Sequence, residues 1–289
     1  MGDTITHYVS DAGLRMSVAY TTNLVEVARR THALSPVAAA ALGRTMTGAL
    51  LLANDFKNKE GVSIRFAGDG PLGTIHADAY DQGKVRGYLD TPRVDLPLKG
   101  PHKLDVGHAV GKGKLYVTRY SLLRQPYQSA IEIVSGEIAE DLTYYLTVSE
   151  QIPSAVSLGV LVNPDESVAA AGGVMVQALP DADDEALTAM EENLRSLGPV
   201  SHAIHTTNSA EIIATLSRDL AFRQVSQNAV KWECTCAKER FERALLQLGA
   251  ADRDELIQDP NGVEMSCHYC KQVYRLSPTE LQALYASKG

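Results

Sequence analysis

SPVAAAALGRTMTGALLLANDFKNKEGVSIRFAGDGPLGTIHADA, residues 35–79, contains the two patterns that decide the fold of this chain. The first is a helix. Ser35 and Pro36 predict its start, because serine is a favoured N-cap and proline a favoured first helical residue. The helix should run to about Phe56, with Gly43 and Gly48 allowing close packing against a neighbour. Its apolar face comprises Leu42, Met46, Ala49, Leu50 and Ala53.

The second pattern is an alternation of apolar and polar residues, which predicts strands. Val62, Ile64 and Phe66 alternate with polar residues, and turns at 68–73 and 81–83 separate this strand from further ones. Outside the quoted stretch, strands are expected within 4–22 and at 115–120, 128–134, 155–162 and 168–179, with a helix at 138–151. Short neighbouring strands with tight turns favour a largely antiparallel sheet, so the predicted fold class is α+β.

Composition and charge exclude several classes of protein. The chain has 289 residues, is 45% hydrophobic and 21% charged, and carries a net charge of −8. A negative net charge repels phosphate backbones, so nucleic acid is not an expected partner. The N-terminus lacks a basic segment followed by an apolar one, and apolar runs fall short of the ~20 residues that a membrane helix needs. We expect a cytoplasmic protein.

The composition changes at Pro180. The segment 181–230 contains one aromatic residue, Phe222, and is rich in small polar residues. It keeps two narrow apolar stripes at helical spacing. One comprises Leu187, Met190, Leu194 and Leu197, and the other Ile212, Ile213, Leu216 and Leu220. Such short helices are marginal alone. The segment is either an ordinary helical connector or a metastable element that can be released.

All four cysteines lie in the last fifth of the chain, as Cys234, Cys236, Cys267 and Cys270. Two close pairs brought together give four thiolates around one metal ion, a set that suits Zn²⁺. The module 231–289 is too small to bury a large apolar core, so it would need a bound metal ion to be stable. Within each pair the sulfurs are near enough to form a disulfide if zinc leaves. On spacing alone, a purely structural zinc is the favoured interpretation.

Other motifs are weaker. Gly68 to Gly73 matches the dinucleotide pattern G-x-G-x-x-G, but these glycines enclose a proline and lead into a strand, so a tight turn is expected instead. His268 is expected to be a bystander, because four cysteines already close the metal site. Cys267 and Cys270 form a C-x-x-C pair like that of a thioredoxin, but the βαβ setting is missing. No nucleophile elbow or zinc-protease motif is present, and we do not expect an enzyme.

At this point the sequence resembles the heat-shock protein 33 family of bacterial redox-regulated chaperones. The resemblance covers nearly the whole chain. Near the C-terminus it rests on WECTCAKERFERALLQLG (232–249) and GVEMSCHYCKQVYRL (262–276). Nearer the N-terminus it rests on ALGRTMTGALLLA (41–53), GDGPLGTIHADA (68–79), EIVSGEIAEDLTYYLTVSEQIPSAVSLGVLVN (132–163) and AAGGVMVQALP (170–180).

The resemblance implies an α+β chaperone core at 1–180, a metastable helical linker at 181–230 and a redox-sensing zinc domain at 231–289. It implies that the reduced, zinc-bound form is inactive. Oxidation would form the disulfides Cys234–Cys236 and Cys267–Cys270, release Zn²⁺, unfold the tail and detach the linker. Exposed hydrophobic surface would then hold unfolding client proteins without ATP, and the active form would be a homodimer.

Two other hypotheses remain open from the residues. One is a partner-binding or nucleic-acid-binding protein with a structural zinc ribbon, which would keep its zinc under mild peroxide. The other is a thiol–disulfide oxidoreductase that uses Cys267 and Cys270, which would turn over substrate disulfides.

Overall fold

The computed structural model describes residues 2–53, 60–80, 83–101, 103–121 and 124–286. The chain folds into two compact units, Met1–Glu233 and Cys234–Gly289, called here the core unit and the cysteine unit. The mixed helices and antiparallel sheets confirm the α+β class. Across the described ranges, every helix is too short or too polar to cross a bilayer.

Sheet A of the core unit joins segments that lie far apart in the sequence. Its order is β10-β1-β2-β9-β8, and every neighbouring pair is antiparallel. A turn at 11–13 joins the first two strands. The strands are β1 (Thr4–Ser10), β2 (Leu14–Tyr20), β8 (Ser154–Val162), β9 (Val168–Ala178) and β10 (Phe222–Ala229).

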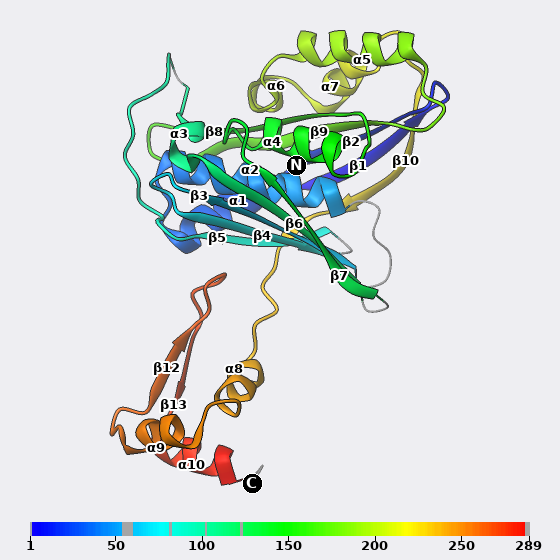
Figure 1. Cartoon of the computed structure of the whole chain (residues 1–289). Helices are drawn as coiled ribbons and strands as arrows, with labels where there is room; N and C mark the ends of the chain where they lie inside the picture. The colour runs from blue at the N-terminus through cyan, green and yellow to red at the C-terminus, as the bar shows by residue number, and fades with distance from the viewer. Residues whose placement is uncertain (1, 54–59, 81–82, 102, 122–123, 287–289) are drawn as a thin grey trace. The chain divides into compact units, whose positions relative to one another are not determined.

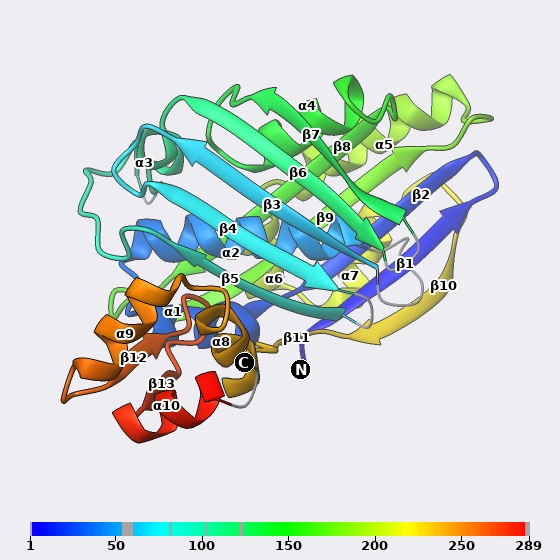
Figure 2. The ribbon, with the colours of Figure 1, turned by 60° about the horizontal axis from the view of Figure 1, so that its bottom comes forward.

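Sheet B has the order β11-β5-β4-β3-β6-β7, and its longer strands run side by side in Figure 2. Only β11, which pairs with β5, is parallel to its neighbour among the described strands. Residues 81 and 82 of the predicted second turn lie outside the described residues. The strands are β3 (Gly61–Gly68), β4 (Thr74–Tyr80), β5 (Lys84–Leu89), β6 (Gly113–Ser121), β7 (Arg124–Glu132) and β11 (Lys231–Trp232).

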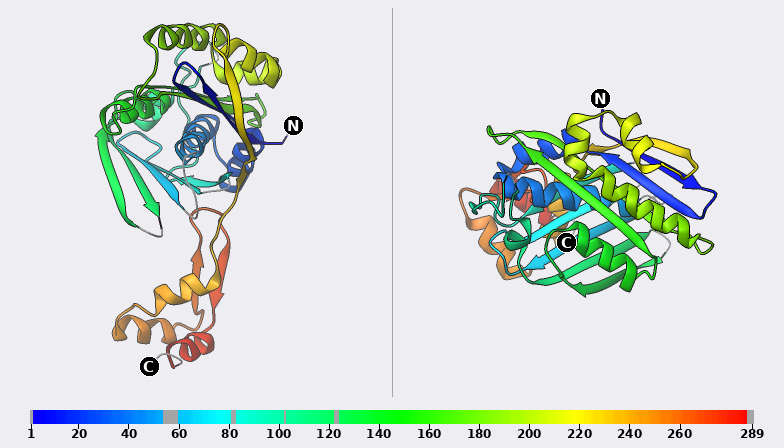
Figure 3. Two further views of the ribbon diagram at one scale, coloured as in Figure 1. Left: turned by 90° about the vertical axis from the view of Figure 1, so that its right-hand side faces the viewer. Right: turned by 90° about the horizontal axis from the view of Figure 1, so that it is seen from above.

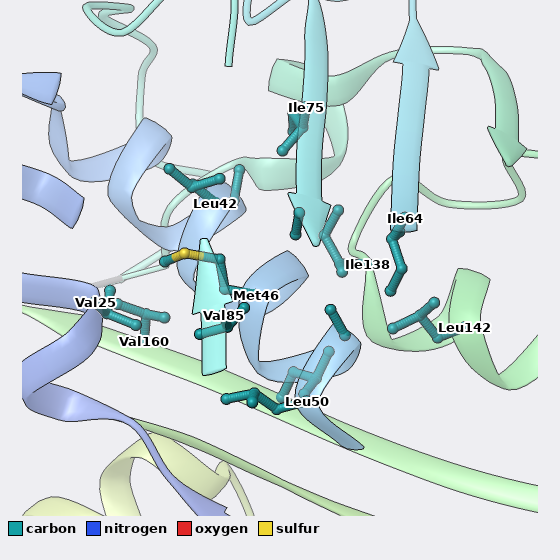
Figure 4. Close-up of a cluster of buried hydrophobic side chains, with 14 of the residues drawn as sticks. Val25, Leu42, Met46, Leu50, Ile64, Ile75, Val85, Ile138, Leu142 and Val160 are labelled. Carbon is teal, nitrogen blue, oxygen red and sulfur yellow. The ribbon is translucent and has the colours of Figure 1, made fainter. Parts of the chain in front are cut away.

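Helix α2 (Pro36–Leu52) lies between the two sheets (Figure 3). It contacts β4 and β5 on one side and β8 and β9 on the other. Figure 4 shows its side chains among those of both sheets and of the neighbouring helices. The labelled residues are Val25, Leu42, Met46, Leu50, Ile64, Ile75, Val85, Ile138, Leu142 and Val160.

The five residues predicted for the apolar face of this helix are all buried, but burial extends beyond that face. Apart from Pro36 and Arg44 the whole helix is buried, as is typical of a helix enclosed by two layers. The prediction of close packing at the glycines was right: a Cβ on Gly43 would lie 2.7 Å from Val25, and one on Gly48 2.4 Å from Leu142. Leu52 ends α2, and Phe56 lies outside the described residues.

Ser35 does precede α2, but its side chain does not cap the helix. Its hydroxyl instead accepts a hydrogen bond from the Val94 amide. Three other helices flank the sheets: α1 (Thr22–His32), α3 (Val106–Val110) and α4 (Ala139–Val148).

The loop at 68–73 is a turn between β3 and β4, as predicted. A Cβ on Gly68 would lie 1.9 Å from the Val110 carbonyl oxygen, so a larger residue would displace α3. Gly73 has a φ of +66°, which favours glycine. Because the chain enters a strand and not a helix, this loop lacks the geometry of a dinucleotide site.

Three helices cover the face of sheet A that points away from α2: α5 (Asp184–Leu197), α6 (Val200–Thr206) and α7 (Ser209–Leu216) (Figure 1). Together with that face of sheet A they form a second apolar core. Its buried sheet residues are Leu14, Met16, Val18, Val174 and Val176, and its buried helix residues are Ala186, Met190, Val200, Ala203, Ile212 and Leu216.

The segment 181–230 is therefore partly helical and partly a strand. Of the two predicted stripes, Met190, Ile212 and Leu216 are buried, and Leu220 lies beyond the end of α7. Its last part forms β10, an edge strand beside β1 that the helical pattern did not predict. Whether this segment is metastable stays a prediction.

The cysteine unit contains α8 (Lys238–Leu245), α9 (Ala250–Gln258), the hairpin of β12 (Val263–Ser266) and β13 (Val273–Leu276), and α10 (Pro278–Ala286). Its apolar cluster has only Leu245, Leu276 and Leu281 as buried members among the described residues. A core of this size offers little stability for more than fifty residues, so the unit needs a further constraint.

Candidate metal centre

Two local structures present the four cysteines. Cys234 and Cys236 lie in the extended segment that leads into α8. Cys267 and Cys270 lie in the turn between β12 and β13. In that turn the Cys267 amide donates to the Gln272 carbonyl at 2.9 Å, and the Lys271 amide donates to the Cys267 carbonyl at 2.9 Å. Lys271 has a φ of +59°, so the turn passes through the left-handed region of backbone conformation.

The structure brings all four predicted residues together. Their sulfur atoms lie within 4.8 Å of one another, and none of the four is in a disulfide. Cys234 Sγ lies 3.7 Å from Cys267 Sγ, and Cys236 Sγ lies 3.2 Å from Cys270 Sγ. Each close contact thus joins one pair to the other across about thirty residues. This group could hold a metal ion.

The sulfurs differ in how readily they ionise. Burial raises the pKa of Cys234 and, more strongly, that of Cys270. Burial also acts to raise the pKa of Cys236, but hydrogen bonds from Tyr274 and the neighbouring thiols outweigh it and lower this pKa below its ordinary value. Four thiols this close cannot all lose their protons without a compensating cation, and a bound divalent metal ion would provide one.

A tyrosine that sequence reasoning did not single out completes the site. The Tyr274 hydroxyl lies 3.2 Å from Cys236 Sγ, and this hydrogen bond raises the pKa of Tyr274 to about 12. The ring of Tyr274 lies against that of Phe241 from α8, with centroids 4.8 Å apart. In the sequence, Tyr274 is only an aromatic residue four positions after Cys270. Its contact with the cysteines cannot be predicted until the register of the hairpin is known.

His268 is exposed and lies outside the group of four. The four cysteine sulfurs lie together at the centre, and their role as metal ligands stays a prediction. Sulfur donors favour soft metal ions over the hard cations that prefer oxygen ligands.

The sequence and fold of this chain are similar to those of known proteins. The model of the Hsp33 protein family matches residues 3–277. The chain belongs to the Hsp33 family. It is 45% identical to the 33 kDa chaperonin of Desulforamulus reducens over 276 residues, which cover 95% of this chain and 94% of that relative. It is 46% identical to the 33 kDa chaperonin of Symbiobacterium thermophilum over 284 residues, covering 97% and 96%.

A solved structure agrees over both units. The crystal structure of the 33 kDa chaperonin from Thermotoga maritima matches with a TM-score of 0.91 and 34% sequence identity. The match covers 100% of this chain and 99% of that one. The Hsp33 fold therefore includes both sheets and the cysteine unit of this chain.

Proposed function

We propose that this Hsp33 family member is an ATP-independent holdase chaperone, and that its four cysteines form a zinc-bound redox switch. The observation that carries the proposal is the four-cysteine cluster in a unit whose described residues include three buried apolar side chains in the core. Zinc binding in small modules contributes about 10–16 kcal/mol, and this is folding free energy. Loss of the ligands would therefore unfold the unit.

The sulfur geometry supports zinc as the metal. Zn–S bonds of about 2.3 Å in a tetrahedron place neighbouring sulfurs about 3.8 Å apart. The observed cross-pair distances are 3.7 and 3.2 Å, with all four sulfurs inside 4.8 Å. Cys234, Cys236, Cys267 and Cys270 would hold the ion. When bound, zinc supplies four metal–thiolate bonds that join the start of the unit to its hairpin.

The switch reaction would use peroxide as the oxidant. One cysteine thiolate attacks a peroxide oxygen; an S–O bond forms, the O–O bond breaks, and the leaving hydroxide takes a proton to become water. A second thiolate then attacks that sulfur, forming the S–S bond as hydroxide leaves. Four thiolates thus give four electrons to two peroxide molecules, and two disulfides replace four metal ligands.

We propose that the disulfides are Cys234–Cys236 and Cys267–Cys270. In the folded unit the closest sulfurs belong to different pairs. As the ligands are lost and the unit loosens, residues 33 or 34 positions apart separate, whereas residues two or three positions apart stay close. The sequence-adjacent pairing would therefore be favoured. Mass spectrometry of proteolytic peptides distinguishes it from the cross-pair alternative.

Unfolding of the cysteine unit would release the linker segment, 181–230. The chain passes from α7 through β10 and β11 directly into Cys234. Helices α6 and α7 have seven and eight residues, too few to be stable alone, so they depend on the face of sheet A. Their detachment would expose the apolar core that they share with that face. Contiguous exposed apolar surface is what a holdase needs to bind unfolding clients.

The proposal also covers the cellular location and the oligomeric state of the protein. Thiols that must stay reduced until stress arrives fit the cytoplasm. Newly exposed apolar surface would also favour association of two copies, so the active form would be a homodimer. The chain would bind clients without catalysing a reaction on them.

Light scattering of a thermally aggregating client tests this function. Peroxide-oxidised protein should suppress aggregation without ATP, and zinc-loaded reduced protein should not. Equal suppression by the two forms would contradict the switch. Retention of zinc by peroxide-treated protein would favour a structural zinc site instead. Catalytic turnover of substrate disulfides that depends on Cys267 would favour an oxidoreductase.

A further inference from the structure

Tyr274 connects the hairpin of the cysteine unit to one particular sulfur. It lies on β13 opposite Met265, and its hydroxyl is 3.2 Å from Cys236 Sγ. Cys236 comes from the other cysteine pair, two residues before α8 begins. The contact therefore exists only while the two halves of the unit are folded together.

Two elements fix the phenol ring in this place. The β12–β13 ladder sets the position of the Tyr274 backbone. Phe241 on α8 packs against the ring at a centroid distance of 4.8 Å and an interplanar angle of 37°. A tilted aromatic pair of this kind contributes more than its buried area alone. The hydroxyl is thus held at the sulfur by packing from both sides of the unit.

The direction of the hydrogen bond follows from the state of the sulfur. A metal-bound cysteine is a thiolate and has no proton to give, so the Tyr274 hydroxyl donates and Cys236 accepts. A donated hydrogen bond draws electron density from the sulfur lone pair. The same lone pair must attack the peroxide oxygen in the first step of oxidation, so the hydrogen bond makes Cys236 a weaker nucleophile.

We infer that Tyr274 is a positioning residue that protects Cys236 from oxidation and so sets the peroxide level at which the switch responds. This inference rests on the proposed function and deepens it. Its chemistry adds no new reactant: peroxide oxidises the thiolate as above, and the Tyr274 proton stays on the phenol oxygen throughout. The hydrogen bond is broken when Cys236 forms its S–O bond.

The first test is the rate of peroxide-triggered zinc release in Tyr274→Phe, which keeps the ring and removes the hydroxyl. Loss of the donated hydrogen bond makes the Cys236 thiolate a stronger nucleophile, so zinc release should be about threefold faster than in the wild type. Tyr285→Phe is the matched control. It removes a buried hydroxyl from the same unit that makes no hydrogen bond within the described residues. Its rate should equal that of the wild type.

Phe241→Leu provides a second variant. It keeps an apolar side chain in the unit but removes the ring that orients the phenol, so zinc release should be intermediate in rate. All variants should bind one zinc per chain before peroxide is added. Equal rates for wild type, Tyr274→Phe and Phe241→Leu would overturn the inference.

Cobalt in place of zinc gives a readout that needs no oxidation. A thiolate that loses a hydrogen bond gives up electrons to the metal more easily, so the sulfur-to-cobalt charge-transfer band of Tyr274→Phe should move to longer wavelength. Tyr285→Phe should leave the band unchanged. An unmoved band in Tyr274→Phe would overturn the inference.

The two readouts separate the two proposals. If the wild type keeps its zinc and thiols in peroxide, the proposed function fails and the threshold role of Tyr274 fails with it. If the wild type responds and Tyr274→Phe responds at the same rate, only the role of Tyr274 fails.

Discussion

Cys267 is the most buried of the four sulfur residues, with 6% of its surface exposed. Replacing it with serine removes one thiolate and leaves an oxygen that binds zinc poorly. We predict that Cys267→Ser binds far less than one zinc per chain and that its cysteine unit unfolds. The reason is that the metal contributes about 10–16 kcal/mol to units of this kind. Metal analysis and hydrogen exchange over residues 234–286 measure both effects.

His268 offers the matched control for this substitution. It is adjacent to Cys267, is exposed, and lies outside the metal-binding group. His268→Ser should keep one zinc per chain and normal protection of the unit. If the two variants bind zinc equally well, the assignment of the ligands is wrong.

At the scale of residues, the sequence predicted which cysteines come together but not which side chains surround them. Two short-spaced cysteine pairs can meet in few ways, so spacing predicted the cluster. Tyr274 was missed because its proximity to Cys236 depends on the register of a hairpin and on the direction of Phe241. Neither follows from the order of residues.

The side chain of Asn193 on α5 forms hydrogen bonds with the backbone at the end of α7. It is buried, and its side-chain amide donates to the Leu216 carbonyl at 3.1 Å and to the Arg218 carbonyl at 2.7 Å. Asn193→Ala would leave both carbonyls without this donor, which should cost the linker helices about 1–3 kcal/mol. We predict faster hydrogen exchange over residues 184–216 in the reduced protein, and a lower temperature or peroxide dose for chaperone activity.

Glu192 is the neighbouring residue on α5 and is exposed. Glu192→Ala should change neither hydrogen exchange nor activation. Asn193→Ala protein with wild-type exchange over 184–216 would show that the amide is not what holds these helices.

Glu26 connects α1 to the first residue of β9. Its carboxylate accepts hydrogen bonds from Arg29 at 2.7 Å and from the Val168 amide at 3.1 Å. Hydrogen bonding to Arg29 is the main cause that lowers the pKa of Glu26 from 4.5 to about 2. A lowered folded-state pKa stabilises the fold above pH 4.5, and this contribution is lost as the pH falls toward 2.

We predict that Glu26→Gln lowers the free energy of unfolding of the core unit by about 1–2 kcal/mol at pH 7. The difference from wild type should shrink as the pH falls from 4.5 toward 2. Urea unfolding followed by Trp232 fluorescence measures it, because Trp232 is the single tryptophan and lies on β11.

Glu191→Gln is the control for this charge change. The Glu191–Arg195 pair is exposed, with side chains 69% and 72% accessible, and exposed pairs contribute little. A pH-independent difference between Glu26→Gln and wild type would contradict the assigned role of the Glu26 carboxylate.

At the scale of elements, alternation and glycine turns predicted most strands of the two sheets. These patterns could not predict that α2 is buried on nearly all sides. That burial arises because the two sheets enclose the helix in the tertiary structure. Strand β10 was missed because it is a polar edge strand without strong alternation. It is a strand because β1 offers it a partner from the other end of the chain.

The whole molecule consists of a large core unit, which includes the segment 181–230, and a small cysteine unit. The core unit has an extensive apolar interior and should survive the switch. The cysteine unit has three buried apolar residues in its described core, so we expect its stability to depend on a bound metal. Length and composition predicted this difference in stability between the two units. They did not predict which face of the core α5–α7 would cover.

The central claim is that loss of the thiolates releases both the cysteine unit and the linker helices from an intact core. Hydrogen exchange measured by mass spectrometry on the full chain, with zinc and free thiols counted in the same samples, tests it most directly. After peroxide, zinc and thiols should fall to zero, and protection should be lost over 234–286 and 184–216 but retained over β3 and β4. Complete loss of zinc with full protection of 184–216 would contradict the account.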